Sequence, residues 1–242
     1  AHQCYAPGPG RKARTLVEKK CLAHIEDLCG PLKNLKVLEL GAGAGYLANL
    51  LIRTGAAYEG LEPKKDLCEK SAECFPETRG KIRPLFPQEA GLKEKSYDLI
   101  IASNFLQYVP EPAVFVRSLA ALLKDGGRLY LEVPNERFLR VRILVRRALH
   151  LYPGRTHPGN INFFTPASLD RTLAAGGLSA AASGQLTLIG DPARLEATLN
   201  KKPGLVFRAL AAAAAASRLD LLLQQGSLFR LCVVRAPDRL RQ

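Results

Sequence analysis

The stretch LELGAGAGYL (residues 38–47) decides the fold, because it joins an apolar run to three glycines placed at every second position. Glycine costs stability in ordered structure unless the backbone needs a positive φ or another group must come very close to it. The residues before the glycines predict a buried strand, and the residues after them predict a helix. Gly41, Gly43 and Gly45 therefore indicate a strand-to-helix turn built around a ligand.

Strand and helix signals alternate on both sides of this turn. An amphipathic helix is expected over residues 11–29, ended by Gly30 and Pro31. Strands are expected in KVLEL, AYEGLE, KIRPL, YDLIIAS and GRLYLEVP, and helices over residues 44–54, 63–75 and 111–124. Apolar strands that alternate with helices form a parallel sheet covered on both faces. The sequence therefore predicts an α/β fold.

The alternation stops near residue 135. Residues 136–164 form a basic, partly amphipathic segment, and the helix in TPASLDRTLAAGG is expected to begin with Thr165 as its N-cap. A strand near residues 185–189 and a last strand in SLFRLCVV bracket residues 191–226. Because long connections in compact domains are usually functional, we expect 136–164 and 191–226 to pack together as caps over the carboxyl edge of the sheet.

Length and composition favour a single globular domain. The 242 residues, 47% of them hydrophobic, suffice for one substantial core. We expect an N-terminal helical lead-in over residues 1–34 and one domain over residues 35–242 that includes both caps. No apolar run approaches the roughly 20 residues that span a bilayer, so no transmembrane segment is expected. Six cysteines without a C-x-x-C pair favour a reduced, cytoplasmic setting and no metal site.

The net charge of +13 would suit nucleic acid or an anionic membrane surface. The basic residues are scattered, however, and no basic stripe is interleaved with aromatic residues. A solvated basic surface is therefore the favoured interpretation, and nucleic acid remains a possible partner that is not favoured.

The glycine spacing separates two kinds of nucleotide-like ligand. The dinucleotide fingerprint is G-x-G-x-x-G, but here the third glycine comes one residue early and Tyr46 stands in its place. The spacing E-x-G-x-G-x-G at residues 39–45 instead resembles the first motif of the class I S-adenosylmethionine-dependent methyltransferases. Residues 97–135 resemble that family's fourth strand, following helix and fifth strand. HPGNINFFTPASLDRTLAAGGL resembles a tail of the branch related to ubiquinone-type methylases, so the resemblance covers most of residues 35–177.

The resemblance implies a fold, a cofactor and a set of binding residues. The fold would be a Rossmann-like, doubly wound, mostly parallel seven-stranded sheet with an antiparallel last strand and helical cap insertions. The cofactor would be S-adenosylmethionine, held above the glycine loop. Glu62 matches the acidic residue that accepts hydrogen bonds from both ribose hydroxyls, a task that suits the two oxygens of a carboxylate. The resemblance also points to cofactor contacts by Glu39, Gln88, Glu89, Ser103 and Asn104.

The function implied is methyl transfer to an oxygen or carbon nucleophile of a small molecule, by a monomer or a homodimer. His157 is the candidate general base, because an imidazole titrates near neutral pH and the family folds this segment over its substrate. Two alternatives remain open. An RNA-directed methyltransferase or binding module would use the basic charge and bind with a steep salt dependence. A dinucleotide-dependent oxidoreductase would share the first strand and turn.

Overall fold

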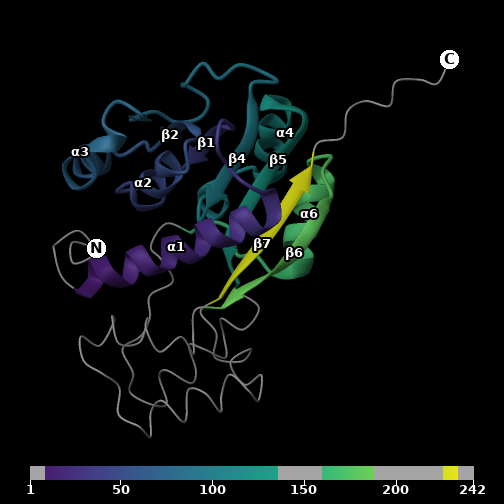
Figure 1. Ribbon diagram of the computed structural model, residues 1–242. Helices are drawn as coiled ribbons and strands as arrows, with labels where there is room; N and C mark the ends of the chain where they lie inside the picture. Colours follow the sequence, from purple (N-terminus) through teal and green to yellow (C-terminus); the bar gives the residue numbers. More distant parts are fainter. Residues whose placement is uncertain (1–8, 136–159, 188–225, 234–242) are drawn as a thin grey trace, which may run out of the picture.

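A single mixed sheet organises the chain (Figure 1). The computed structural model describes residues 9–135, 160–187 and 226–233. The strands are β1 (Lys36–Leu40), β2 (Ala57–Leu61), β3 (Ile82–Arg83), β4 (Tyr97–Ser103), β5 (Leu123–Pro134), β6 (Ala180–Thr187) and β7 (Gly226–Val233). His157 and most of the two expected caps lie outside the described residues.

The strand order is β3-β2-β1-β4-β5-β7-β6. Strands β1 to β5 run parallel, whereas β7 is antiparallel to both of its neighbours. The expected parallel sheet with an antiparallel last strand is therefore confirmed. The chain order reverses between β1 and β4, and open α/β sheets bind ligands at the carboxyl ends of the strands at such a point.

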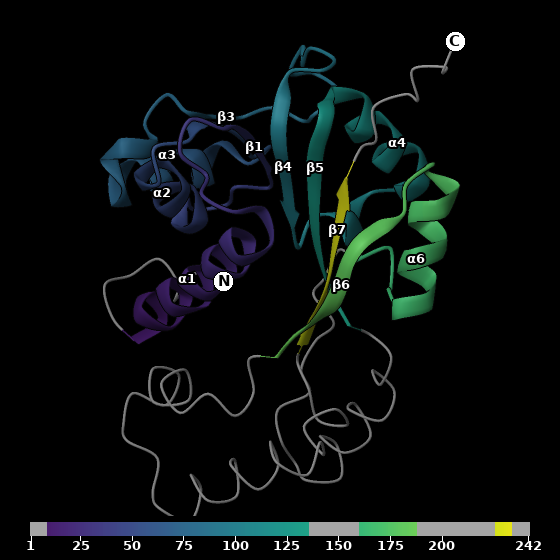
Figure 2. The ribbon, with the colours of Figure 1, turned by 45° about the vertical axis from the view of Figure 1, so that its right-hand side comes forward.

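Helices cover both faces of the sheet (Figure 2). The helices are α1 (Pro9–Cys29), α2 (Tyr46–Arg53), α3 (Lys65–Cys74), α4 (Pro112–Leu122) and α6 (Pro166–Ala175), with 3-10 turns η2 (Pro76–Thr78) and η3 (Leu106–Tyr108). One core cluster lies between the sheet and helices α4 and α6, and the other lies beneath α1 and α2. None of the helices in the described ranges is long and apolar enough to cross a bilayer.

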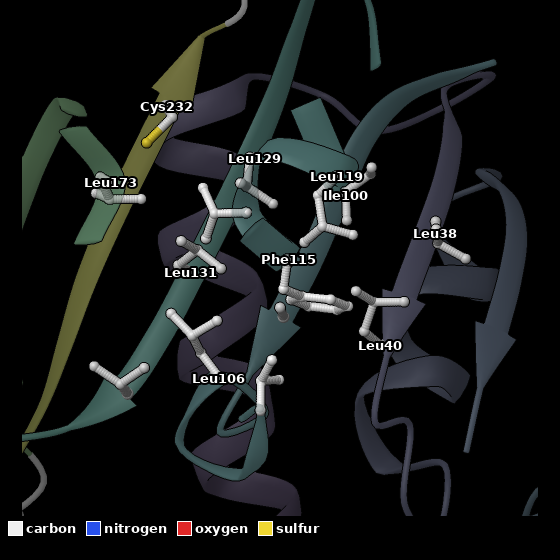
Figure 3. Close-up of a cluster of buried hydrophobic side chains, with 14 of the residues drawn as sticks. Leu38, Leu40, Ile100, Leu106, Phe115, Leu119, Leu129, Leu131, Leu173 and Cys232 are labelled. Carbon is white, nitrogen blue, oxygen red and sulfur yellow. The ribbon is translucent and has the colours of Figure 1, made fainter. Parts of the chain in front are cut away.

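The side chains of each strand alternate between these two clusters. Leu38 and Leu40 of β1 belong to the cluster shown in Figure 3, which also contains Phe115 of α4. Val37 lies on the opposite face with Ile25 of α1. Because both faces are buried, the parallel strands need continuous apolar runs, and this explains the unbroken hydrophobicity of β1 and β4.

Two boundaries differ from the sequence-based expectation. Strand β6 begins at Ala180 rather than near residue 185. Residues 180–184 (AAASG) have little intrinsic strand propensity, so their pairing with β7 imposes the conformation. Strand β5 begins at Leu123 rather than at the expected Gly127, and its pairing with β4 shifts register between Tyr97 and Leu99.

The N-terminus of α6 is fixed by a capping box. The Thr165 side chain accepts a hydrogen bond from the Ser168 amide at 3.2 Å, and the Ser168 hydroxyl accepts one from the Thr165 amide at 2.8 Å. The predicted N-cap is thereby confirmed. These bonds satisfy amides that have no partner within the helix.

We expect Thr165→Ala to lower the free energy of unfolding by about 1 kcal/mol, because an N-cap is lost. Thr172→Ala in the same helix is the matched control, since it removes a threonine from the interior, where alanine is the better helix former. Urea denaturation measures both changes. Equal losses for the two variants would contradict the capping interpretation.

Candidate active site

The glycine loop leaves β1 through three left-handed residues. Gly41, Gly43 and Gly45 have φ values of 75°, 56° and 77°, a region that other residues rarely adopt. The amides of Gly41 and Ala42 both donate to the Leu61 carbonyl, at 2.8 and 3.1 Å. The loop is therefore tied to the carboxyl end of β2, and α2 begins directly after Gly45.

The three glycines serve different needs. A Cβ on Gly45 would lie 1.9 Å from the Ser71 hydroxyl oxygen, and one on Gly41 would lie 2.8 Å from the Phe105 ring. Packing within the protein therefore accounts for these two. A Cβ on Gly43 would meet nothing closer than the Gly41 carbonyl oxygen at 3.9 Å, so the space above Gly43 is open. Gly43 is thus the position at which the loop leaves room for a ligand.

Glu62 follows β2 and fastens the loop from the side. One of its carboxylate oxygens accepts a hydrogen bond from the Gly43 amide at 2.9 Å, and the other accepts one from the Lys64 amide at 3.0 Å. The residue is only 7% exposed. A carboxylate oxygen can accept two hydrogen bonds, so each oxygen of Glu62 keeps one acceptor site.

Glu39 is buried beneath the loop rather than within it. Its carboxylate accepts a hydrogen bond of 2.5 Å from the Tyr58 hydroxyl, and both residues lie on the α1 face of the sheet. Gly60 makes this contact possible, because a Cβ there would lie 2.3 Å from the Tyr58 oxygen. Burial and the adjacent Glu39 charge raise the pKa of Tyr58 well above its usual value, so Tyr58 remains a hydrogen-bond donor.

Ser103 and Glu132 form a hydrogen-bonded pair at the carboxyl ends of β4 and β5. They are register partners, and the Ser103 hydroxyl donates to the Glu132 carboxylate at 3.1 Å. The next residue, Asn104, has a φ of 52°, and its amide donates to the Glu132 carbonyl at 2.7 Å. The left-handed turn at Asn104 therefore ends β4 and holds Ser103 beside Glu132.

Helix α1 brings further polar groups to the same edge. It runs antiparallel to β5, since its Cys21 thiol donates to Glu132 at 3.6 Å and its Cys29 carbonyl accepts from Arg128 at the other end of that strand. Burial, followed by the charges of Glu132 and Glu18, raises the pKa of Cys21 well above its usual value. The thiol therefore stays protonated near neutral pH, and the buried carboxylates give this part of the site a negative potential.

Two side-chain hydrogen bonds stabilise the connection after β3. The Glu89 carboxylate accepts a hydrogen bond from the Phe86 amide at 3.0 Å, and the Ala90 carbonyl accepts one from Arg83 at 3.1 Å. Gln88 and Glu89 are exposed. The exposed Phe86 lies three residues after the end of β3.

A buried polar group lies in the turn after β4. Gln107 is only 2% exposed, yet its side-chain carbonyl oxygen has no hydrogen-bond partner among the described residues. Its backbone carbonyl accepts from the amides of Ile161 and Asn162, both at 3.0 Å. The buried side-chain oxygen of Asn160 likewise has no partner in the part of the chain that the structure describes. Exposed apolar side chains flank this turn: Tyr108, Ile161 and Phe163.

The structure thus places the sequence-predicted residues in three groups. Glu62 and the glycine loop are in direct contact, and Ser103 and Asn104 are at the neighbouring strand end. Gln88 and Glu89 lie in the separate turn after β3. Sequence reasoning missed Glu132 and Gln107. A glutamate inside the apolar stretch LYLEVP was the only signal for Glu132, and Gln107 gave none.

No group of three metal-ligating side chains comes together within the described ranges.

Comparison of the sequence with known proteins gives a family match. A family model described as a methyltransferase domain matches residues 13–182. The ubiquinone biosynthesis O-methyltransferase of Bordetella avium (strain 197N) is 30% identical over 175 residues, which cover 65% of this chain and 67% of that protein.

Solved structures agree with the family match at the level of the fold. Magnesium protoporphyrin IX methyltransferase from Synechocystis PCC 6803 with bound SAH aligns with a TM-score of 0.58 and 18% identity, covering 93% of this chain and 84% of that one. A putative sarcosine dimethylglycine methyltransferase from Galdieria sulphuraria aligns with a TM-score of 0.60 and 16% identity, covering 91% and 86%.

Position 43 and position 45 require glycine for different reasons, and substitutions can test this difference. Gly43→Ala should cost about 1 to 2 kcal/mol of unfolding free energy, the cost of a left-handed non-glycine residue. Gly45→Ala should cost about 1 to 3 kcal/mol more, because its Cβ also overlaps the Ser71 side chain. Guanidinium denaturation of both variants measures the difference. Equal losses would show that Ser71 moves aside without cost.

Proposed function

The chain belongs to the class I S-adenosylmethionine-dependent methyltransferases, and from this premise we propose that it methylates a hydroxyl oxygen of a small, largely apolar molecule. The observation that carries this proposal is Gln107, a buried acceptor that has no hydrogen-bond partner in residues 9–135, 160–187 and 226–233 and is flanked by exposed apolar side chains. The names of the O-methyltransferase relatives support oxygen as the acceptor atom.

The residues around the glycine loop fit S-adenosylmethionine. The two acceptor sites that Glu62 retains, one on each oxygen, suit the adjacent hydroxyls of a ribose. The open space above Gly43 lets the cofactor approach the backbone closely. Buried Glu39 places negative charge beneath the loop, which complements the positive charges of the cofactor. We assign the cofactor site to Glu62, Gly43 and the backbone of residues 41–45, with Glu39 below.

The remaining predicted cofactor contacts receive narrower roles. Ser103 and Asn104 end β4, next to the loop that follows β1, and would lie beside the reacting groups. Gln88 and Glu89 are proposed to border the adenine, with Glu89 acting through the turn that it closes at the Phe86 amide.

The proposed acceptor side of the site differs from the cofactor side because it has exposed apolar side chains. Tyr108, Ile161 and Phe163 are each about half exposed. Tyr108 follows Gln107 in the chain, and the Ile161 amide donates to the Gln107 backbone carbonyl. An apolar substrate would cover these side chains, and its hydroxyl or another donor would satisfy Gln107. An unpaired buried acceptor costs about 1 to 3 kcal/mol, so this binding energy is available to a substrate that carries a donor.

S-adenosylmethionine, when bound, supplies a methyl group already activated on a sulfonium. The chain's residues then have to orient the acceptor oxygen and keep water away. Gln107 and its apolar neighbours would orient the acceptor, while Glu62 and the loop would fix the donor. His157 stays a candidate general base, outside the described residues.

Two alternatives make different predictions. A carbon acceptor would not need the hydrogen-bond acceptor of Gln107, so its methylation should be insensitive to that side chain. An RNA substrate would use the basic charge, and its binding would weaken steeply with salt. We favour a small molecule, because the buried oxygens that have no partner among the described residues lie in a turn flanked by apolar side chains. The absence of a C-x-x-C pair among the six cysteines supports a cytoplasmic setting.

A screen with labelled methyl donor tests the proposed function. Metabolite extracts and a panel of simple phenols would be incubated with the chain, and the labelled products would be treated with base to separate ethers from esters. A labelled ether is the expected product. Labelled RNA, or C-methylated product alone, would contradict the proposal.

Glu62→Ala should weaken binding of S-adenosylhomocysteine by about 1.5 to 3 kcal/mol, because hydrogen bonds to a charged group are lost. Isothermal titration calorimetry measures the change. Glu89→Ala, at the exposed turn, is the matched control and should lose less. Unchanged affinity in Glu62→Ala would place the ribose elsewhere.

Gln107→Leu should raise the stability of the unliganded chain and raise KM for a hydroxyl-bearing acceptor. The substitution removes the buried unpaired oxygen that the substrate would satisfy. Thermal unfolding and steady-state kinetics measure the two effects, and the affinity for S-adenosylhomocysteine should not change. A stabilised variant with unchanged KM would show that Gln107 does not meet the acceptor.

A further inference from the structure

Ser103 and Glu132 form a side-chain hydrogen bond that cofactor binding does not explain. Ser103 ends β4, the strand that leads into the turn of Gln107, and its hydroxyl donates to the carboxylate of its register partner Glu132 over 3.1 Å. Glu132 is 6% exposed. Within the described ranges, its carboxylate receives the Ser103 hydroxyl and the Cys21 thiol, both neutral donors. Burying a carboxylate with neutral donors alone is costly, which suggests that Glu132 has a chemical task.

Ser103 has one hydrogen-bonding position left. A hydroxyl carries one proton and two acceptor lone pairs. The proton is directed to Glu132, and one lone pair accepts the Asn104 side-chain amide at 3.3 Å. The second lone pair is available to accept a proton from a ligand. Ser103 is half-buried at the strand end, so a ligand at the carboxyl edge can reach it.

We propose that Ser103 and Glu132 form a proton relay for the acceptor hydroxyl. This inference rests on the proposed function, methyl transfer to oxygen. The acceptor O–H donates to the free lone pair of Ser103, and Glu132 is the final proton acceptor. Ser103 is then the catalytic residue in contact with the substrate, and Glu132 acts through it.

The step balances without a further reactant. The acceptor oxygen forms its new bond to carbon with a lone pair, and the electrons of the broken carbon–sulfur bond stay on sulfur. The acceptor proton moves to the Ser103 oxygen while the Ser103 proton moves to Glu132. Glu132 becomes a neutral acid, and its proton returns to solvent when the product leaves.

Glu132 lies among titratable groups of α1 and of its own strand. Its carboxylate accepts the Cys21 thiol and the Ser103 hydroxyl, and its charge acts on His24 and Tyr130. Burial lowers the pKa of His24, so this imidazole is neutral near pH 7. Burial raises the pKa of Tyr130 above its usual range, so its phenol stays neutral and does not compete for the proton.

The relay is tested with acceptors of graded acidity. Phenol, with a pKa near the tyrosine value of about 10, keeps its proton at neutral pH, whereas nitro-substituted phenols lose theirs more easily. Glu132→Gln preserves size and a hydrogen-bond acceptor but takes up no proton. We expect it to slow single-turnover methylation of phenol by about 100-fold or more, the scale of general-base catalysis, and to slow the more acidic phenols progressively less.

Variants at Ser103 separate the relay from general damage. Ser103→Ala should show the same dependence on acceptor acidity, while Ser103→Thr keeps a hydroxyl and should recover much of the rate. Ser118→Ala on α4, where the hydroxyl bonds only to the Phe115 carbonyl, is the matched serine control. Calorimetry should give S-adenosylhomocysteine affinities within about threefold of the wild type for every variant, a difference of under about 1 kcal/mol.

A readout without turnover uses the absorbance of 4-nitrophenol bound together with S-adenosylhomocysteine. The ionised Glu132 behind Ser103 disfavours the phenolate, so the bound probe should ionise at a higher pH in the wild type than in Glu132→Gln. Identical titrations in the two proteins would overturn the relay.

Three further outcomes would each overturn the relay. An equal loss of rate for all phenols, together with weaker cofactor binding, would make Glu132 a charge partner of the cofactor and overturn the relay. Full activity of Ser103→Ala would do the same while leaving the proposed function intact. If the wild type binds S-adenosylhomocysteine but methylates no phenol and no other hydroxyl in the extract, transfer to oxygen fails and the relay fails with it.

Discussion

The bidentate contact of one carboxylate holds the site together. Glu62 accepts the Gly43 amide on one oxygen and the Lys64 amide on the other, so the loop after β1 and the turn after β2 share a single anchor. Since β1 and β2 are parallel partners in register, their ends already lie side by side, and the anchor needs no distortion of the sheet. Gly43 directs its amide toward Glu62 from a left-handed conformation, with a φ of 56°.

The glycine turn and the cap of α6 could be predicted from the sequence because their signals are local. Glycines at every second position after an apolar run indicate a turn with positive φ values, and Gly41, Gly43 and Gly45 have them. Thr165 belongs to the same class, since its partner Ser168 is three residues away. Glu62 is different, because its partner Gly43 is 19 residues away and only the family resemblance pointed to it.

The acceptor side could not be predicted in this way, because its geometry arises from contacts distant in sequence. Glu132 meets Ser103, 29 residues away, and Cys21, 111 residues away. The bulk of Ser71, not a ligand, explains why position 45 must be glycine, and no spacing rule encodes that contact. The start of β6 was misplaced for the same reason, since its alanines form a strand only through pairing with β7.

The distribution of charge connects these two halves of the site. The chain carries a net charge of +13, yet Glu18, Glu39, Glu62 and Glu132 are all buried. Most of the basic side chains that the structure describes are at the surface, where water screens their charges. The buried carboxylates lie in a region of low dielectric constant, where electrostatic interactions are stronger. The local potential at the carboxyl edge is therefore set by these glutamates rather than by the net charge. A cationic methyl donor and a departing proton are both species that such an edge would stabilise.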